Sequence, residues 1–229
     1  MQYVRILAAV LACLAAGSAG ATVVSLVTSG SAAGVEVTEK SFRLDTGTLR
    51  VRPYLLPGTT PGDKFVSALL SPTASGVGVC EARTCGSYFE PVDNEGSLEW
   101  LLFTFTPFPA ARFNSFSLVP ATPGDYDTTY YYGEMSEAEL DAGLAGQPLA
   151  RLSQYTTGTS SNLMTVSVNG TGNFLLVGAR YPDLDGQRDF FFVQTINLNT
   201  IPAIPETSTL ILFAAGLALL ARLRIRQLS

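Results

Sequence analysis

Carboxylates and tyrosines are the residues of this sequence that could do chemistry, because the chain has no histidine. Without histidine, Ser-His-Asp and Cys-His catalysis and every His-ligated metal centre are excluded. Glu90, Asp93, Glu95 and Glu99 lie close together in the sequence. Two such carboxylates hydrolyse glycosides when they face each other across about 5 to 9 Å, but spacing alone places no pair at that distance. We interpret the segment as a surface loop and predict that the chain is not an enzyme and has no catalytic residue.

Two further groups of aspartates lie beside turn residues: Asp183, Asp185 and Asp189 surround Gly186, and Asp125 and Asp127 come after Pro123 and Gly124. Clustered carboxylates on a turn can coordinate calcium. The order of an EF-hand loop is missing, however, and Arg188 places a cation inside the first group. Since Asp and Gly are ordinary hairpin residues, we interpret both segments as solvated turns and predict neither a metal nor a cofactor.

Tyr130, Tyr131 and Tyr132 form a tyrosine-rich segment. Exposed aromatic rings combine apolar area with a polar group and can stack on sugars. The three tyrosines are therefore our candidate ligand-binding residues, with exopolysaccharide as the candidate partner and Trp100 as a further aromatic. Alternation of aromatics along a strand is equally typical of a sandwich core, so solvent exposure in one coplanar strip is the feature that would distinguish the two.

Three cysteines are present, and Cys13 lies in the N-terminal apolar run. If that run is removed on export, Cys80 and Cys85 remain, an even number in an oxidising compartment. We predict a disulfide between them. A metal or redox pair is the alternative, but the chain supplies no histidine and no second cysteine pair for it.

Charge and length limit the classes of protein. The 229 residues carry 14 Lys+Arg and 19 Asp+Glu, and the part between residues 22 and 205 has a net charge of about −8. Neutralising phosphates requires clustered cations, so nucleic acid is not expected as a partner. About 180 residues suit one domain with its own core.

Period-2 alternation of apolar residues recurs along residues 22–200, the predicted domain. Five segments read as strands: 48–55, 98–105, 163–168, 174–181 and 190–198. Turn residues between them predict an all-β fold, an antiparallel β-sandwich or jelly-roll-like single domain. Ser136 and Glu139 form a capping box that predicts one short helix over 137–145, placed at one end of the sandwich.

The N-terminus resembles an export signal. Arg5 precedes an apolar run from Ile6 to Ala16, and Ala19-Gly20-Ala21 matches a signal-peptidase site. We predict a signal peptide over residues 1–21, with signal peptidase as a partner. A membrane anchor is the alternative, but the apolar run is shorter than the roughly 20 residues that a span requires.

Three features follow one another in residues 201–229. The motif Pro205-Glu206-Thr207-Ser208-Thr209 is followed by an apolar stretch from Leu210 to Ala221 and then by Arg222, Arg224 and Arg226. A helix of twelve residues rises only about 18 Å, against a hydrocarbon core of about 30 Å. Flanking residues and snorkelling arginines bring it closer to a marginal transmembrane helix, with the arginines cytoplasmic.

This arrangement resembles the PEP-CTERM sorting signal of Gram-negative bacteria. In that family a Pro-Glu-Pro-like motif, a short transmembrane helix and a basic tail are recognised by a membrane exosortase; here Thr207 stands where the second proline usually lies. The resemblance covers about the last 26 residues. It implies export, transient anchoring in the inner membrane, cleavage near the motif by an exosortase-like membrane protease, and release to the cell surface or extracellular matrix. A plain membrane anchor is the alternative.

From this we expect a surface or exopolysaccharide (biofilm) matrix protein with a structural or adhesive role. The first alternative is a secreted carbohydrate-binding module, and a less favoured one is a glycoside hydrolase.

Overall fold

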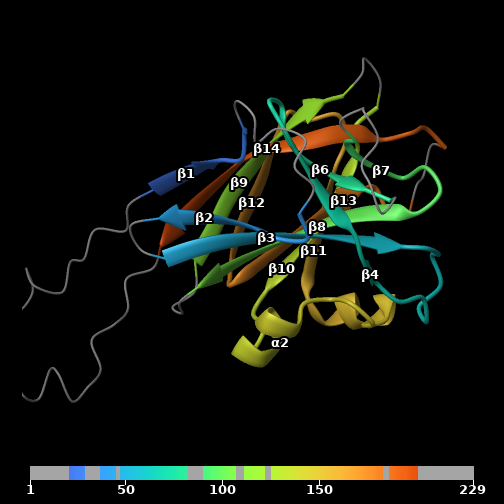
Figure 1. Cartoon of the computed structure of the whole chain (residues 1–229), viewed down its shortest axis with the longest axis horizontal. Helices are drawn as coiled ribbons and strands as arrows, with labels where there is room; N and C mark the ends of the chain where they lie inside the picture. Colours follow the sequence, from blue (N-terminus) through green and yellow to red (C-terminus); the bar gives the residue numbers. More distant parts are fainter. Residues whose placement is uncertain are drawn as a thin grey trace, which may run out of the picture.

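A computed structural model describes residues 21–28, 37–44, 47–81, 90–106, 111–121, 125–182 and 186–200. These residues form two antiparallel sheets packed face to face, so the predicted all-β sandwich is confirmed (Figure 1). Each sheet has seven strands.

The first sheet has the order β12-β9-β14-β6-β5, with β1 and β7 also paired to β14. Its strands are β1 (Ala21–Ser25), β5 (Leu69–Thr73), β6 (Gly76–Cys80), β7 (Val92–Asp93), β9 (Ala111–Pro120), β12 (Thr165–Gly172) and β14 (Phe190–Thr200). The second sheet has the order β11-β10-β13-β8-β3-β2, with β4 paired to β3. Its strands are β2 (Lys40–Leu44), β3 (Gly47–Leu56), β4 (Val66–Ser67), β8 (Leu98–Thr106), β10 (Thr128–Gly133), β11 (Thr156–Ser160) and β13 (Phe174–Ala179).

Strand β8 lies inside the second sheet and buries both of its faces, as its uninterrupted apolar sequence predicts. Leu101, Phe103 and Phe105 face the core between the sheets. Trp100 and Leu102 face the other way, into a second hydrophobic cluster. The strand predicted over 98–105 is therefore confirmed, and its apolar side chains cover both of its faces.

Two short helices cover this second cluster on the outer face of the second sheet. Helix α2 (Glu137–Ala142) begins with the predicted capping box, in which Ser136 Oγ accepts from the Glu139 N–H and the Glu139 carboxylate accepts from the Ser136 N–H. Leu140, Leu144 and Leu152 pack there with Trp100. The expectation that the helix closes one end of the sandwich is therefore wrong. The helical segment packs instead on the apolar outer face of β8 and β13.

The helix also ends three residues earlier than predicted. Gly143 is its C-cap with φ 70°, and its N–H donates to the Glu139 carbonyl. A 3₁₀ helix that the sequence did not predict, η2 (Leu149–Gln154), follows Pro148 and buries Leu149 and Leu152. The described residues thus contain two short helices where one was expected.

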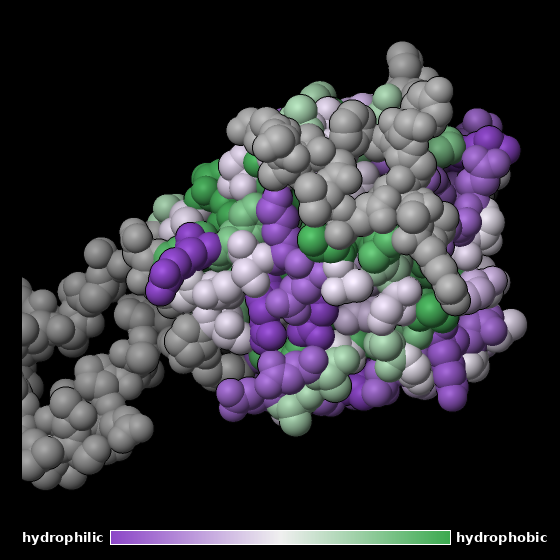
Figure 2. All heavy atoms as spheres, viewed as in Figure 1, coloured by the Kyte–Doolittle hydropathy of each residue, from purple (hydrophilic) through white to green (hydrophobic). Residues whose placement is uncertain are grey.

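One face of the described residues carries both polar and apolar side chains. Figure 2 shows hydrophilic residues across this face, with hydrophobic residues in separate patches among them. Within the part of the chain described here, no helix is long and apolar enough to cross a membrane.

Candidate functional site

The tyrosines of β10 lie on two different faces of the second sheet. Tyr130 packs in the core between the sheets, where its ring lies 5.6 Å from that of Phe116 and its hydroxyl donates to the Ser167 carbonyl at 3.3 Å. Tyr131 points to the opposite face and packs with Trp100, ring centre to ring centre 5.9 Å. Tyr132 packs partly against the same core as Tyr130. The three rings therefore cannot form the coplanar strip that the ligand-binding hypothesis requires.

Glycines on neighbouring strands make room for these rings. A Cβ atom added to Gly158 would lie 2.3 Å from the Tyr130 ring, and one added to Gly170 would lie 2.2 Å from the Tyr132 ring. Gly158 belongs to edge strand β11 and Gly170 to edge strand β12. Tyr130 and Tyr132 thus join the edges of the two sheets, which gives both a structural role. Trp100 is also fully buried.

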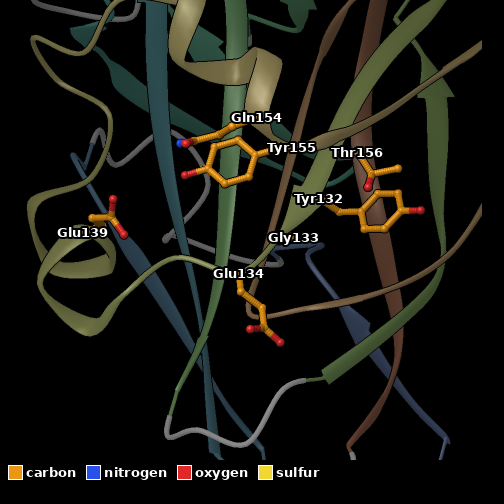
Figure 3. A pocket seen from close by; sticks show the side chains of 7 residues that line it. All are labelled: Tyr132, Gly133, Glu134, Glu139, Gln154, Tyr155 and Thr156. Carbon is orange, nitrogen blue, oxygen red and sulfur yellow. The ribbon is translucent and has the colours of Figure 1, made fainter.

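Two pockets share a tyrosine that the sequence analysis did not select, Tyr155. The first pocket, of about 310 Å³, is polar and is shown in Figure 3. Its lining consists of Tyr132, Gly133, Glu134, Glu139, Gln154, Tyr155 and Thr156. The second, also about 310 Å³, is more apolar and is lined by Pro61, Tyr131, Leu149, Ala150, Leu152, Ser153, Tyr155, Thr157 and Tyr181.

The local structure fixes Tyr155 between these pockets. It is the C-cap of η2, where its N–H donates to the Leu152 carbonyl, and it leads directly into β11. Its ring meets the ring of Phe174 edge to face at 4.6 Å. In β11, Thr156 pairs with Tyr132 and Thr157 with Tyr131, so the two pockets include residues from opposite faces of the same strand pair.

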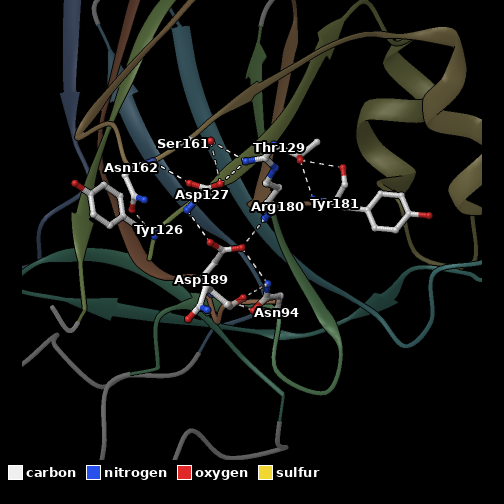
Figure 4. Close-up of polar contacts among 10 residues, drawn as sticks. Asn94, Tyr126, Asp127, Thr129, Ser161, Asn162, Arg180, Tyr181 and Asp189 are labelled. Carbon is white, nitrogen blue, oxygen red and sulfur yellow. Dashed lines mark hydrogen bonds and ion pairs between the residues drawn. The ribbon is translucent and has the colours of Figure 1, made fainter. Parts of the chain in front are cut away.

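Asp127, Arg180 and Asp189 meet in a buried polar network at the start of β10 and β14 (Figure 4). The Arg180 guanidinium pairs with the Asp127 carboxylate, which also accepts from the Ser161 hydroxyl. Asp189 accepts from the Asp127 N–H at 2.7 Å and from the Asn94 amide at 2.9 Å. The interpretation of these aspartates as solvated is wrong, since Asp127 is 3% and Asp189 2% exposed.

The network brings together turn residues that the sequence treated as two groups. Carboxylate oxygens of Asp125, Asp127 and Asp189 lie within 4.8 Å of one another. Burial, and then the charges of Asp125 and Asp127, raise the pKa of Asp189 to about 7. The Asp127 and Asp189 oxygens accept from N–H and O–H groups of several loops, so we assign these two carboxylates to holding the loops together.

Glu99 is buried in β8 with 2% exposure, so the interpretation as a surface loop is wrong for this residue. One carboxylate oxygen of Glu99 accepts from the Asp93 N–H at 2.9 Å. Burial, then the Asp93 charge, raises the pKa of Glu99 to about 10, and burial raises the pKa of Asp93 to about 6. A general acid needs a raised pKa, but neither pocket around Tyr155 contains Glu99 or Asp93.

Several predicted site residues lie outside the described residues. Cys80, fully buried at the end of β6, is disulfide-bonded. Its expected partner Cys85 is not among the described residues, and neither are residues 1–20 of the predicted signal peptide, Asp183, Asp185, the sorting motif 205–209, the predicted transmembrane helix and the three arginines. The Cys80–Cys85 pairing and the sorting signal therefore stay predictions.

Long-range pairing, which has no local sequence signal, creates the pockets. Gln154 and Tyr155 lie more than 20 residues from Tyr132, and only the pairing of β10 with β11 brings them together. Comparisons with known proteins found no matching family model, no similar curated protein and no similar solved structure. The candidate site is therefore defined by the residues of this chain alone.

Proposed function

We propose that the chain is an exported surface or extracellular-matrix protein with a structural or adhesive role, sorted by its C-terminal PEP-CTERM-like signal. One observation carries the proposal: a Pro-Glu motif at residues 205–206, an apolar stretch too short for a comfortable span, and three arginines follow one another at the end of the sequence. Signal peptidase and an exosortase-like membrane protease are the processing partners.

The arrangement of the body is compatible with this route. Strand β1 begins at Ala21, where the predicted signal peptide ends, and β14 ends at Thr200, where the predicted sorting region begins. A jelly-roll-like sandwich of this kind could follow its signal peptide directly and be held from one end by the tail. The disulfide-bonded Cys80 suits an oxidising compartment outside the cytoplasm.

A hydrolase is the weaker candidate. Two of the three carboxylates with raised pKa values, Glu99 and Asp93, are joined because the Asp93 N–H donates to the Glu99 carboxylate, which is buried. Asp127 and Asp189 accept hydrogen bonds from several loops. These carboxylates hold the fold together, and none of them lines the two pockets around Tyr155.

Fractionation of the producing bacterium tests the proposal. Replacing Pro205 and Glu206 by alanine should leave the protein in the inner membrane, whereas Pro202→Ala, three residues before the motif, should leave release unchanged. Unchanged release of the motif variant would overturn the sorting proposal. Retention of the unaltered protein in the inner membrane would favour a plain anchor instead.

A further inference from the structure

Tyr155 presents an aromatic surface to two pockets at once. It lines both the polar pocket with Glu134 and Gln154 and the more apolar pocket with Tyr131 and Tyr181. Each measures about 310 Å³, near the lower limit of small-molecule sites. That size suits one sugar ring in each pocket, with Tyr155 between them.

The chemistry of the lining matches the two sides of a pyranose ring. A pyranose has an apolar C–H face and a rim of hydroxyl groups, and tyrosine offers a flat apolar ring that ends in a hydroxyl. In the polar pocket, the Gln154 amide, the Thr156 hydroxyl and the Glu134 carboxylate supply hydrogen-bonding groups. In Figure 3, Gln154 lies beside Tyr155, Thr156 lies beside Tyr132, and the Glu134 carboxylate lies below both rings. Leu149 and Leu152 supply an apolar wall in the second pocket.

The aromatic groups are held in place before any ligand arrives. The Tyr155 ring is supported by Phe174 at 4.6 Å, and Tyr131 by Trp100 at 5.9 Å. The Tyr181 hydroxyl donates to the Thr59 carbonyl at 2.7 Å. Rings that are already ordered lose little conformational entropy on binding, which favours a shallow site of this kind.

The charges in the polar pocket select among sugars. Glu134 is exposed, and Glu139 forms an ion pair with Arg151 while it caps α2. The two glutamates line the pocket, and Arg151 does not. Carboxylates accept hydrogen bonds from sugar hydroxyls and attract amines, but they repel the carboxylate of a uronic acid.

We infer that the two pockets around Tyr155 bind a glycan of neutral or amino-substituted hexopyranoses, with one ring on each side of Tyr155. This rests on the proposed matrix role, because it names the polymer contact that an adhesive protein would make.

Calorimetry on the protein purified from whichever cell fraction holds it tests the site with three hexasaccharide probes: cellohexaose, chitosan hexamer and an alginate hexamer. We expect binding of a neutral or amino probe and none of alginate. Tyr155→Ala should weaken binding at least tenfold. Gln154→Ala and Glu134→Gln, at exposed side chains, should each weaken it about threefold to tenfold, the range of one lost hydrogen bond.

Glu137→Gln is the matched control, since this exposed glutamate lines neither pocket. If Tyr155→Ala fails to fold because the ring contact with Phe174 is lost, the binding measured for Gln154→Ala and Glu134→Gln tests the site instead. Three results would overturn the inference. They are no binding of any probe, binding by the Gln154→Ala and Glu134→Gln variants that equals that of the unaltered protein, and alginate binding as strong as that of the other probes. Release from the cell is measured separately. A protein that is released but binds no sugar would refute the glycan site alone. A protein that binds sugar but is not released would refute the sorting proposal alone.

Discussion

Ala21 pairs with Asn199 across β1 and β14, so the first and last described strands lie side by side in one sheet. The predicted signal peptide and the predicted sorting tail therefore adjoin the body at the same end of the sandwich. The polar network of Asp127, Arg180 and Asp189 lies at the start of β14, the opposite end of that strand.

Gly178→Ala should destabilise the fold. A Cβ atom at this position would lie 2.4 Å from the Trp100 indole and 2.7 Å from the Glu99 carbonyl oxygen, and neither can move far inside the sheet. Overpacking of this kind lowers the free energy of unfolding by about 1 to 3 kcal/mol. Gly62→Ala is the control, with nothing within 4 Å of its Cβ. Equal urea midpoints for the two variants would contradict the packing of Trp100 against Gly178.

Asp127→Asn should also lower the free energy of unfolding. The carboxylate is 4% exposed and pairs with Arg180, so its replacement by a neutral amide removes a buried ion pair. We expect a loss of about 2 to 5 kcal/mol in urea denaturation. The exposed pair of Asp141 with Arg50, 3.0 Å apart, provides the comparison, and Asp141→Ala should cost about 1 kcal/mol or less. A smaller loss for Asp127→Asn than for Asp141→Ala would speak against the network.

Stability should fall as the pH rises from 5 to 8. Burial raises the pKa of Glu99 to about 10 and that of Asp189 to about 7, whereas both groups ionise near pH 4 in the unfolded chain. Above pH 4 the folded chain holds more protons than the unfolded chain, so the stabilisation present below pH 4 is lost as the pH approaches these values. Glu99→Gln, which removes one of the two groups, should flatten the dependence. A melting temperature that rises over this range, or an equally steep slope in the variant, would contradict the burial of these carboxyls.

Ser136→Ala should remove the capping box of α2. The alanine has no oxygen to accept from the Glu139 N–H, and loss of an N-cap costs about 1 kcal/mol. Thermal unfolding monitored by circular dichroism measures the effect. Ser136→Asp retains an acceptor and should restore the melting temperature, whereas a melting temperature unchanged by alanine would show that the cap adds no stability.

The sequence predicted the layers of the fold and the side-chain directions of the central strands. Leu49 and Val51 of β3 face the core while Arg50 lies on the opposite face, because a strand repeats every two residues. The capping box located the start of α2 correctly. The strand predicted over 163–168 begins only at Thr165, and Met164, just before it, is 58% exposed.

The candidate site was largely beyond the reach of the sequence. Tyr131 was selected, but Tyr155 and Tyr181 reach the same pocket only through strand pairing and the folding of η2 over β8 and β13. The meeting of Asp127 with Asp189 likewise depends on which loops lie at one end of the sandwich. Such contacts are set by topology, for which local spacing gives no signal.

Intact mass spectrometry of the protein recovered from the cell surface and the medium tests the sorting of this chain most directly. The predicted result is a chain that starts after Ala21 and has lost Arg222, Arg224 and Arg226 by cleavage near Pro205. A mature protein that still carries the three arginines would contradict the sorting signal, and with it the proposed matrix role.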